Sequence, residues 1–174
     1  MLRTSAPLIG ALGVIRTAMF FRALMAFVAL PGVFAFLVPT FIASQSTFEF
    51  SLAGAIVFGI GLVTLLWCVV TFCINGKGTL APWSPPRRLV TVGLYRFSRN
   101  PMYVGVLLVL AGWAILFQSL VLVCYMGVIA VAFHLRVVLG EEPWLAKTHG
   151  AEWQRYEESV PRWLWPSSRR TSPK

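Results

Sequence analysis

Four long apolar stretches, separated by short polar segments, dominate the pattern of this chain. They cover residues 19–43, 52–74, 101–117 and 120–139. A helix needs about 20 apolar residues to cross a bilayer, and the third stretch is short by that measure. Only Gln118 and Ser119 separate the last two stretches, which predicts a tight antiparallel hairpin. The pattern therefore predicts an all-α, integral membrane helical bundle of about four spans.

Proline and glycine modify this picture within the first two stretches. Pro31 and Pro39 interrupt the first one, which allows a kink or a re-entrant bend. Whether this stretch forms one span or two therefore stays open. Gly54, Gly59 and Gly61 lie in the second stretch, where they favour close packing against another helix.

The residues after the fourth stretch are more polar and follow a different pattern. Residues 141–156 combine charged positions with Trp144, Leu145, Trp153 and Tyr156, which predicts a short C-terminal interfacial helix. Residues 167–174 are mostly Ser, Arg and Lys, and we expect a disordered tail.

Composition and charge narrow the class of protein. Hydrophobic residues make up 57% of the 174 residues and charged residues only 12%, which excludes an ordinary soluble domain. The net charge of +9 does not indicate nucleic-acid binding, because the basic residues flank the apolar stretches. The link at residues 44–51 has no Lys or Arg, whereas the next link and the tail are basic. The positive-inside rule then places both termini in the cytoplasm.

The three cysteines carry no recognisable chemistry. Cys68, Cys73 and Cys124 lie within or beside apolar stretches, and their number and spacing fit neither a disulfide framework nor a metal site. We therefore interpret them as small packing residues and predict no metal.

Polar side chains gather where the last two apolar stretches approach the same membrane face. If these stretches form an antiparallel hairpin, the start of one and the end of the other are neighbours. Ionisable groups at membrane depth indicate a functional site, because leaving them unpaired is costly. The residues that should converge are Arg99, Asn100, Tyr103, Arg136, Glu141 and Glu142.

Plainer explanations exist for each of these residues taken alone. Arg96 and Arg99 could reach lipid phosphate, the two glutamates could be solvated, and Arg136 could form an internal salt bridge. The combination favours a zwitterionic ligand with a cationic centre, because arginine binds carboxylates, glutamate binds ammonium and aromatic faces attract a sulfonium. S-adenosylmethionine has all of these features, although composition alone does not name it.

Three sequence blocks carry a family resemblance. They read GKGTLAPW with PRRLV (residues 76–90), GLYRFSRNPMYVG (93–105) and EEPWL with VPRW (141–163). In this order and spacing, the chain resembles the isoprenylcysteine carboxyl methyltransferase family and its phospholipid methyltransferase relatives. Five positions depart from the family pattern: Leu94 replaces a common Pro, Asn100 a frequent His (Asn also occurs there), His149 and Trp153 an expected Phe and Tyr, and the final Pro166 falls one place late.

The resemblance implies a membrane methyltransferase that uses S-adenosylmethionine on a lipid-like or isoprenylated acceptor in the bilayer. It favours O-methylation of a carboxylate, with N-methylation of a phospholipid amine and a non-catalytic, lipid-binding scaffold as alternatives. It also implies one membrane domain, with N-terminal spans in residues 1–75 and a methyltransferase core in residues 76–166. The acceptor and the oligomeric state stay open.

The resemblance also assigns roles to single residues. Arg136 and Glu142 are the expected catalytic residues, and Arg136 either contacts the acceptor or holds the glutamates. His134 is a weaker candidate for a base, and Asn100 in place of His leaves a general base at that position open. The expected cofactor-binding residues are Tyr95, Arg99, Asn100, Pro101, Tyr103, Glu141 and Glu142.

Overall fold

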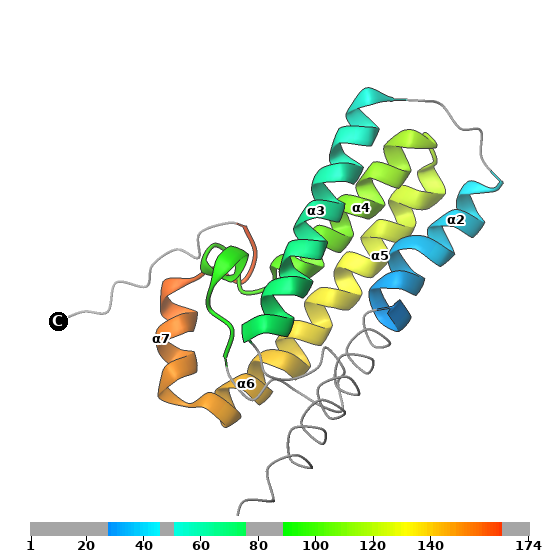
Figure 1. Ribbon diagram of the computed structural model, residues 1–174. Helices are drawn as coiled ribbons and strands as arrows, with labels where there is room; N and C mark the ends of the chain where they lie inside the picture. Colours follow the sequence, from blue (N-terminus) through cyan, green and yellow to red (C-terminus); the bar gives the residue numbers. More distant parts are fainter. Residues whose placement is uncertain (1–27, 46–50, 76–88, 165–174) are drawn as a thin grey trace, which may run out of the picture.

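The computed structural model describes residues 28–45, 51–75 and 89–164, and every regular element in these ranges is helical (Figure 1). This confirms the all-α prediction. The elements are the π-helix η1 (Val28–Leu37), α2 (Val38–Ala43), α3 (Leu52–Asn75), the 3-10 helix η2 (Gly93–Arg96), α4 (Pro101–Leu116), α5 (Leu120–Arg136), the π-helical turn η3 (Val137–Glu141), α6 (Glu142–His149) and α7 (Ala151–Ser159).

Two continuous helices among the described residues are long and apolar enough to cross a bilayer. They cover Leu52–Phe72 and Leu120–His149, while Gly32–Ala43 and Pro101–Leu116 are apolar but shorter. Only about a fifth of each long apolar window is buried within the protein, at 22% and 17%. Helices in the core of a soluble protein would be mostly buried, so these surfaces suit contact with lipid.

The hairpin of α4 and α5 has the tight turn that the sequence predicts. Pro101 is the first residue of α4, where its missing N–H costs nothing, and it is buried. At the other end Gln118 has a φ of +44°, and the Ser119 N–H donates to the Ala114 carbonyl at 3.2 Å. The two helices therefore run antiparallel side by side (Figure 1), with the start of α4 beside the end of α5.

Glycines set the close contact between α3 and α4. A Cβ on Gly61 would lie 2.5 Å from the Val109 backbone nitrogen, and one on Gly112 would lie 2.6 Å from the Phe58 Cα. Both positions exclude a side chain because the two backbones nearly touch. The prediction for Gly59 was wrong, since nothing lies within 4 Å of a Cβ added there.

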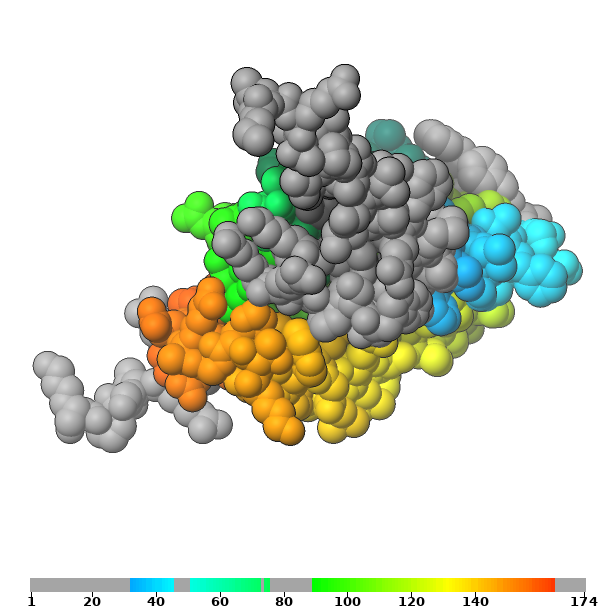
Figure 2. Space-filling model, turned by 60° about the horizontal axis from the view of Figure 1, so that its bottom comes forward, coloured from blue at the N-terminus to red at the C-terminus, as the bar shows by residue number. Residues whose placement is uncertain are grey.

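The prediction of one interfacial helix over residues 141–156 was also wrong. The α5 helix continues through η3 into α6 without a break (Figure 1), and the yellow and orange parts of the chain lie against one another in the space-filling view (Figure 2). The break comes at Gly150, whose φ of +49° ends α6 and redirects the chain into α7. Trp153, Tyr156 and Val160 then pack together in a small separate core.

Several predictions lie outside the described residues or only partly within them. Of the first apolar stretch, residues 28–43 are described, and they are π-helical to Leu37 and α-helical from Val38. The loop at residues 76–88 and the tail at residues 167–174 lie outside the described part of the chain.

Candidate functional site

The short helix η2 attaches the segment before α4 to the rest of the protein. Gly93 begins it with a φ of +64°, and Tyr95 is buried in a cluster with Cys68 and Val90. The Tyr156 hydroxyl donates to the Tyr95 carbonyl at 2.7 Å. Burial raises the pKa of both tyrosines above the ordinary value.

The turn that follows η2 is tied to the C-terminal segment mainly through the backbone. The Arg99 N–H donates to the Pro161 carbonyl at 2.9 Å. The Arg162 carbonyl accepts from the Ser98 hydroxyl at 3.3 Å and from the Asn100 side-chain amide at 3.1 Å. Asn100 therefore precedes α4 without capping it, because its side chain bonds to the C-terminal segment instead. These contacts join residues about 60 positions apart in sequence.

Four charged residues form what we name the Arg99 network, made of Arg99, Glu142, Glu157 and Arg162. Arg99 Nη1 lies 2.8 Å from Glu142 Oε1 and 3.0 Å from Glu157 Oε1. Arg162 binds Glu142 with two hydrogen bonds, from Nε to Oε1 at 2.9 Å and from Nη2 to Oε2 at 2.7 Å. These bonds with Glu142 raise the pKa of Arg162.

The centre of the Arg99 network is buried. The side chains of Arg99 and Glu142 are only 6% and 12% exposed, whereas Glu157 is 44% exposed. The Arg99 guanidinium carbon lies 5.6 Å from the centre of the Trp153 ring, a cation–π contact. Within the part of the chain that the structure describes, both ion pairs of Arg99 use Nη1, and its buried Nε has no hydrogen-bond partner. A buried, unpaired guanidinium donor is costly, so this edge is suited to an acceptor.

A second group, the Glu141 cluster, consists of Tyr103, Arg136 and Glu141. Glu141 Oε1 accepts a short hydrogen bond from the Tyr103 hydroxyl and one of 2.8 Å from Arg136 Nε. Arg136 Nε also lies 3.1 Å from the Tyr103 hydroxyl. The Tyr103 ring stacks on Phe133 with ring centres 4.4 Å apart, which holds α4 against α5. Arg136 is 46% exposed, so this cluster is more accessible than the centre of the Arg99 network.

His134 lies beside the C-terminal segment and has an aromatic partner. Trp163 stacks on its ring at 6.3 Å between centres, and the indole N–H donates to His134 Nδ1 at 3.4 Å. Nδ1 is therefore the acceptor in this contact. This agrees with the interpretation of His134 as a packed residue rather than a base.

Most of the residues predicted for the site do meet in space, but in two groups instead of one. Arg99 meets Glu142, while Tyr103 and Arg136 meet Glu141. Tyr95 stands apart, since its side chain packs in an apolar cluster and makes no hydrogen bond or ion pair with the other described site residues.

Sequence reasoning did not assign site roles to Glu157, Arg162 and Trp153. Glu157 could have been found, because the chain has only six acidic residues against 15 Lys and Arg, so each acidic residue is a candidate partner for a buried arginine. Arg162 and Trp153 could not, because their positions depend on the chain reversal at Gly150.

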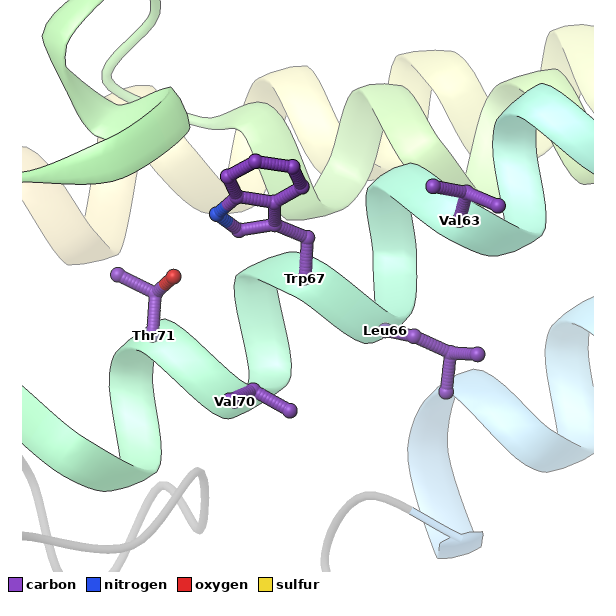
Figure 3. A pocket seen from close by; sticks show the side chains of 5 residues that line it. All are labelled: Val63, Leu66, Trp67, Val70 and Thr71. Atoms are coloured by element: carbon purple, nitrogen blue, oxygen red, sulfur yellow. The ribbon is translucent and has the colours of Figure 1, made fainter.

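A pocket on the outer face of α3 is separate from both groups of charged residues. It has a volume of about 380 Å³ and is lined by Val63, Leu66, Trp67, Val70 and Thr71, all from this one helix (Figure 3). It is open and mostly apolar, and none of the predicted site residues lines it.

Comparison with known proteins identifies the family. The family model described as phospholipid methyltransferase matches residues 50–152, which covers more than half of the chain and spans α3 to α6. No curated protein and no solved structure matched in the two other comparisons. This family is related to the isoprenylcysteine carboxyl methyltransferases, and its members are membrane enzymes that transfer a methyl group from S-adenosylmethionine to lipids. With its long apolar helices, the chain therefore belongs to the phospholipid methyltransferase family of membrane methyltransferases.

Proposed function

We propose that the Arg99 network and Glu141 together hold the amino-acid part of S-adenosylmethionine. The observation that carries the proposal is the Arg99 Nε, a buried donor without a partner among the described residues, on a side chain that is 94% buried. A carboxylate placed against this edge would satisfy it with a charge-assisted hydrogen bond. The buried Trp153 ring already faces the Arg99 guanidinium, so its proposed part is to hold that side chain in place.

The two glutamates have different capacities for a ligand. Glu142 already accepts three hydrogen bonds from two arginines, so its proposed role is to hold Arg99 in place. In Glu141 both bonds within the described residues use Oε1, so Oε2 is suited to the ammonium group of the cofactor. Asn100 and Pro101 form the start of α4, and Tyr95 packs in an apolar cluster that also contacts Met102 in the first turn of α4.

The reaction needs positioning more than acid–base chemistry from the protein. The bound cofactor supplies an activated methyl group on its sulfonium. The charged residues fix its orientation, and the low exposure of Arg99 and Glu142 keeps most water away from them. Both effects favour a direct displacement. Arg136, which is half exposed beside Tyr103, is the proposed contact for the acceptor headgroup.

Two acceptor classes fit this site. A phospholipid amine is the first candidate, because the family model is described as phospholipid methyltransferase. A lipid carboxylate, which sequence reasoning favoured, is the second. It needs no proton removed before attack, and the Nδ1 of His134, the candidate base, accepts a hydrogen bond from Trp163.

The proposed setting is a bundle of about four spans with both termini in the cytoplasm and α7 at the cytoplasmic interface. The basic links support this orientation through the positive-inside rule. The proposed methyltransferase core, residues 76–166, contains both groups of charged residues, and the family match adds α3 to it.

Two experiments test the function. The first titrates the purified, full-length protein in lipid nanodiscs with S-adenosylhomocysteine by calorimetry; saturable binding is expected, and no binding would overturn the cofactor site. The second incubates the protein with lipid extract and a labelled methyl donor, then treats the product with alkali. A headgroup N-methyl resists alkali, whereas a methyl ester releases labelled methanol. Binding without any labelled lipid would favour the non-catalytic scaffold.

A further inference from the structure

Arg162 contacts the candidate site through both its side chain and its main chain. Its guanidinium holds both oxygens of Glu142, at 2.9 Å and 2.7 Å. Its carbonyl accepts from Asn100 and Ser98, at 3.1 Å and 3.3 Å. One residue thus fixes a carboxylate on α6 and the turn before α4. It lies beyond residues 50–152, the part that matches the family model.

The geometry at Glu142 explains why a second arginine matters. Arg99 uses only Nη1 there, and it bonds to the same oxygen that receives Arg162 Nε. A single bond leaves a carboxylate free to rotate, whereas the two parallel bonds from Arg162 define its plane. The plane of Glu142 in turn sets the direction of Arg99 Nη1, and so the direction of the unpaired Nε edge.

Charge balance supports the same role. The Arg99 network contains two arginines and two glutamates and is neutral as a whole. Without Arg162, one buried guanidinium would face two carboxylates, Glu142 and Glu157. Arg99 would then be drawn towards both glutamates, which disfavours binding of a further carboxylate.

We infer that Arg162 is a positioning residue, which sets the affinity for the methyl donor by orienting Glu142 and Arg99 without touching the donor itself. The inference rests on the proposed cofactor site. Arg162 is 34% exposed, so it is partly open to water and is not the buried centre of the network. We therefore attribute the orienting effect to the two parallel hydrogen bonds from Arg162 to Glu142. Lysine keeps the positive charge but cannot form both bonds.

The test compares Arg162→Lys and Arg162→Gln with wild type in nanodiscs. We expect the Kd for S-adenosylhomocysteine to rise roughly tenfold or more in both variants, with a larger rise for Gln. The KM for the lipid should stay near the wild-type value, because the Glu141 cluster is intact. The control is Arg155→Gln, since Arg155 is exposed on α7 and forms no ion pair within the described residues; its Kd should equal that of wild type.

A double variant separates positioning from direct contact. If Arg162 acts through Glu142, then Glu142→Gln with Arg162→Gln should bind no more weakly than Glu142→Gln alone. Independent, additive losses would overturn the inference. So would a wild-type Kd in Arg162→Lys, which decides the question even if Arg162→Gln does not fold. Absence of binding in the wild-type protein would instead remove the cofactor site itself.

Discussion

Replacing Glu142 by glutamine is the sharpest test of the buried charges in this structure. The substitution keeps the size of the side chain and removes the charge. It affects three hydrogen bonds at once, one from Arg99 and two from Arg162. The amide NH₂ would also point a donor at a guanidinium, where the carboxylate offers an acceptor.

The expected loss follows from the exposure of each partner. Removing one member of a buried ion pair costs about 3–5 kcal/mol, because the remaining charge is left uncompensated. Arg162 is one-third exposed and can regain water, and Arg99 keeps Glu157 at 3.0 Å. The lower end of the range therefore applies. We expect the free energy of unfolding to fall by about 3 kcal/mol, or the Tm by roughly 6–12 °C for a chain of this size.

The assay is thermal unfolding of the purified protein in detergent, followed by circular dichroism. Glu158→Gln is the matched control, because Glu158 is exposed on α7 and forms no ion pair within the described part of the chain. Its free energy of unfolding should stay within about 0.5 kcal/mol of wild type. A Glu142→Gln protein as stable as this control would refute the reasoning, because the carboxylate could not then be held by two arginines.

Three further predictions concern backbone contacts and pH. Gly61→Ala should lower the free energy of unfolding by about 1–3 kcal/mol, because its Cβ would lie 2.5 Å from an α4 backbone nitrogen; Gly59→Ala, with open space around it, should be neutral or stabilising in the same thermal assay. Burial raises the pKa of Tyr156, so the folded state keeps a proton that the unfolded state loses above about pH 10. The free energy of unfolding should therefore fall as pH rises beyond 10. Tyr156→Phe should make this fall less steep by about 1.4 kcal/mol per pH unit, with the free energy measured by denaturant titration at each pH. Gly150→Ala should cost about 1–2 kcal/mol because of its positive φ, whereas Gly140→Ala, with nothing near the added Cβ, should not destabilise the fold.

The pairing of Arg99 with Glu142 could be predicted from sequence because it needs only the hairpin. Two apolar stretches joined by a two-residue turn must bring the start of one beside the end of the other, and polar residues at those ends then meet. The face of α3 that packs on α4 could not be predicted. Gly59 and Gly61 are equivalent in the apolar pattern, and only the observed packing distinguishes them.

The contribution of the C-terminal segment could not be predicted for a different reason. Residues 141–156 have no proline after Pro143, and Gly150 alone is tolerated within a helix, so the pattern suggests one continuous element. The positive φ at Gly150 is a tertiary outcome. This turn redirects α7 so that Trp153 contacts Arg99, and the segment after α7 brings Arg162 to Glu142.

The two adjacent glutamates explain how one rigid element can serve two parts of a site. Neighbouring residues on a helix point about 100° apart, which is enough for Glu141 to meet Tyr103 and Arg136 while Glu142 meets Arg99. Both carboxylates belong to the continuous rod of α5, η3 and α6, so the distance between the two groups is fixed by a helix and not by a loop. Sites built on helices hold their geometry better than sites on loops. In the proposed function the cofactor lies at Arg99 and Glu141 and the acceptor headgroup at Arg136, so this rod fixes how closely the two reactants approach.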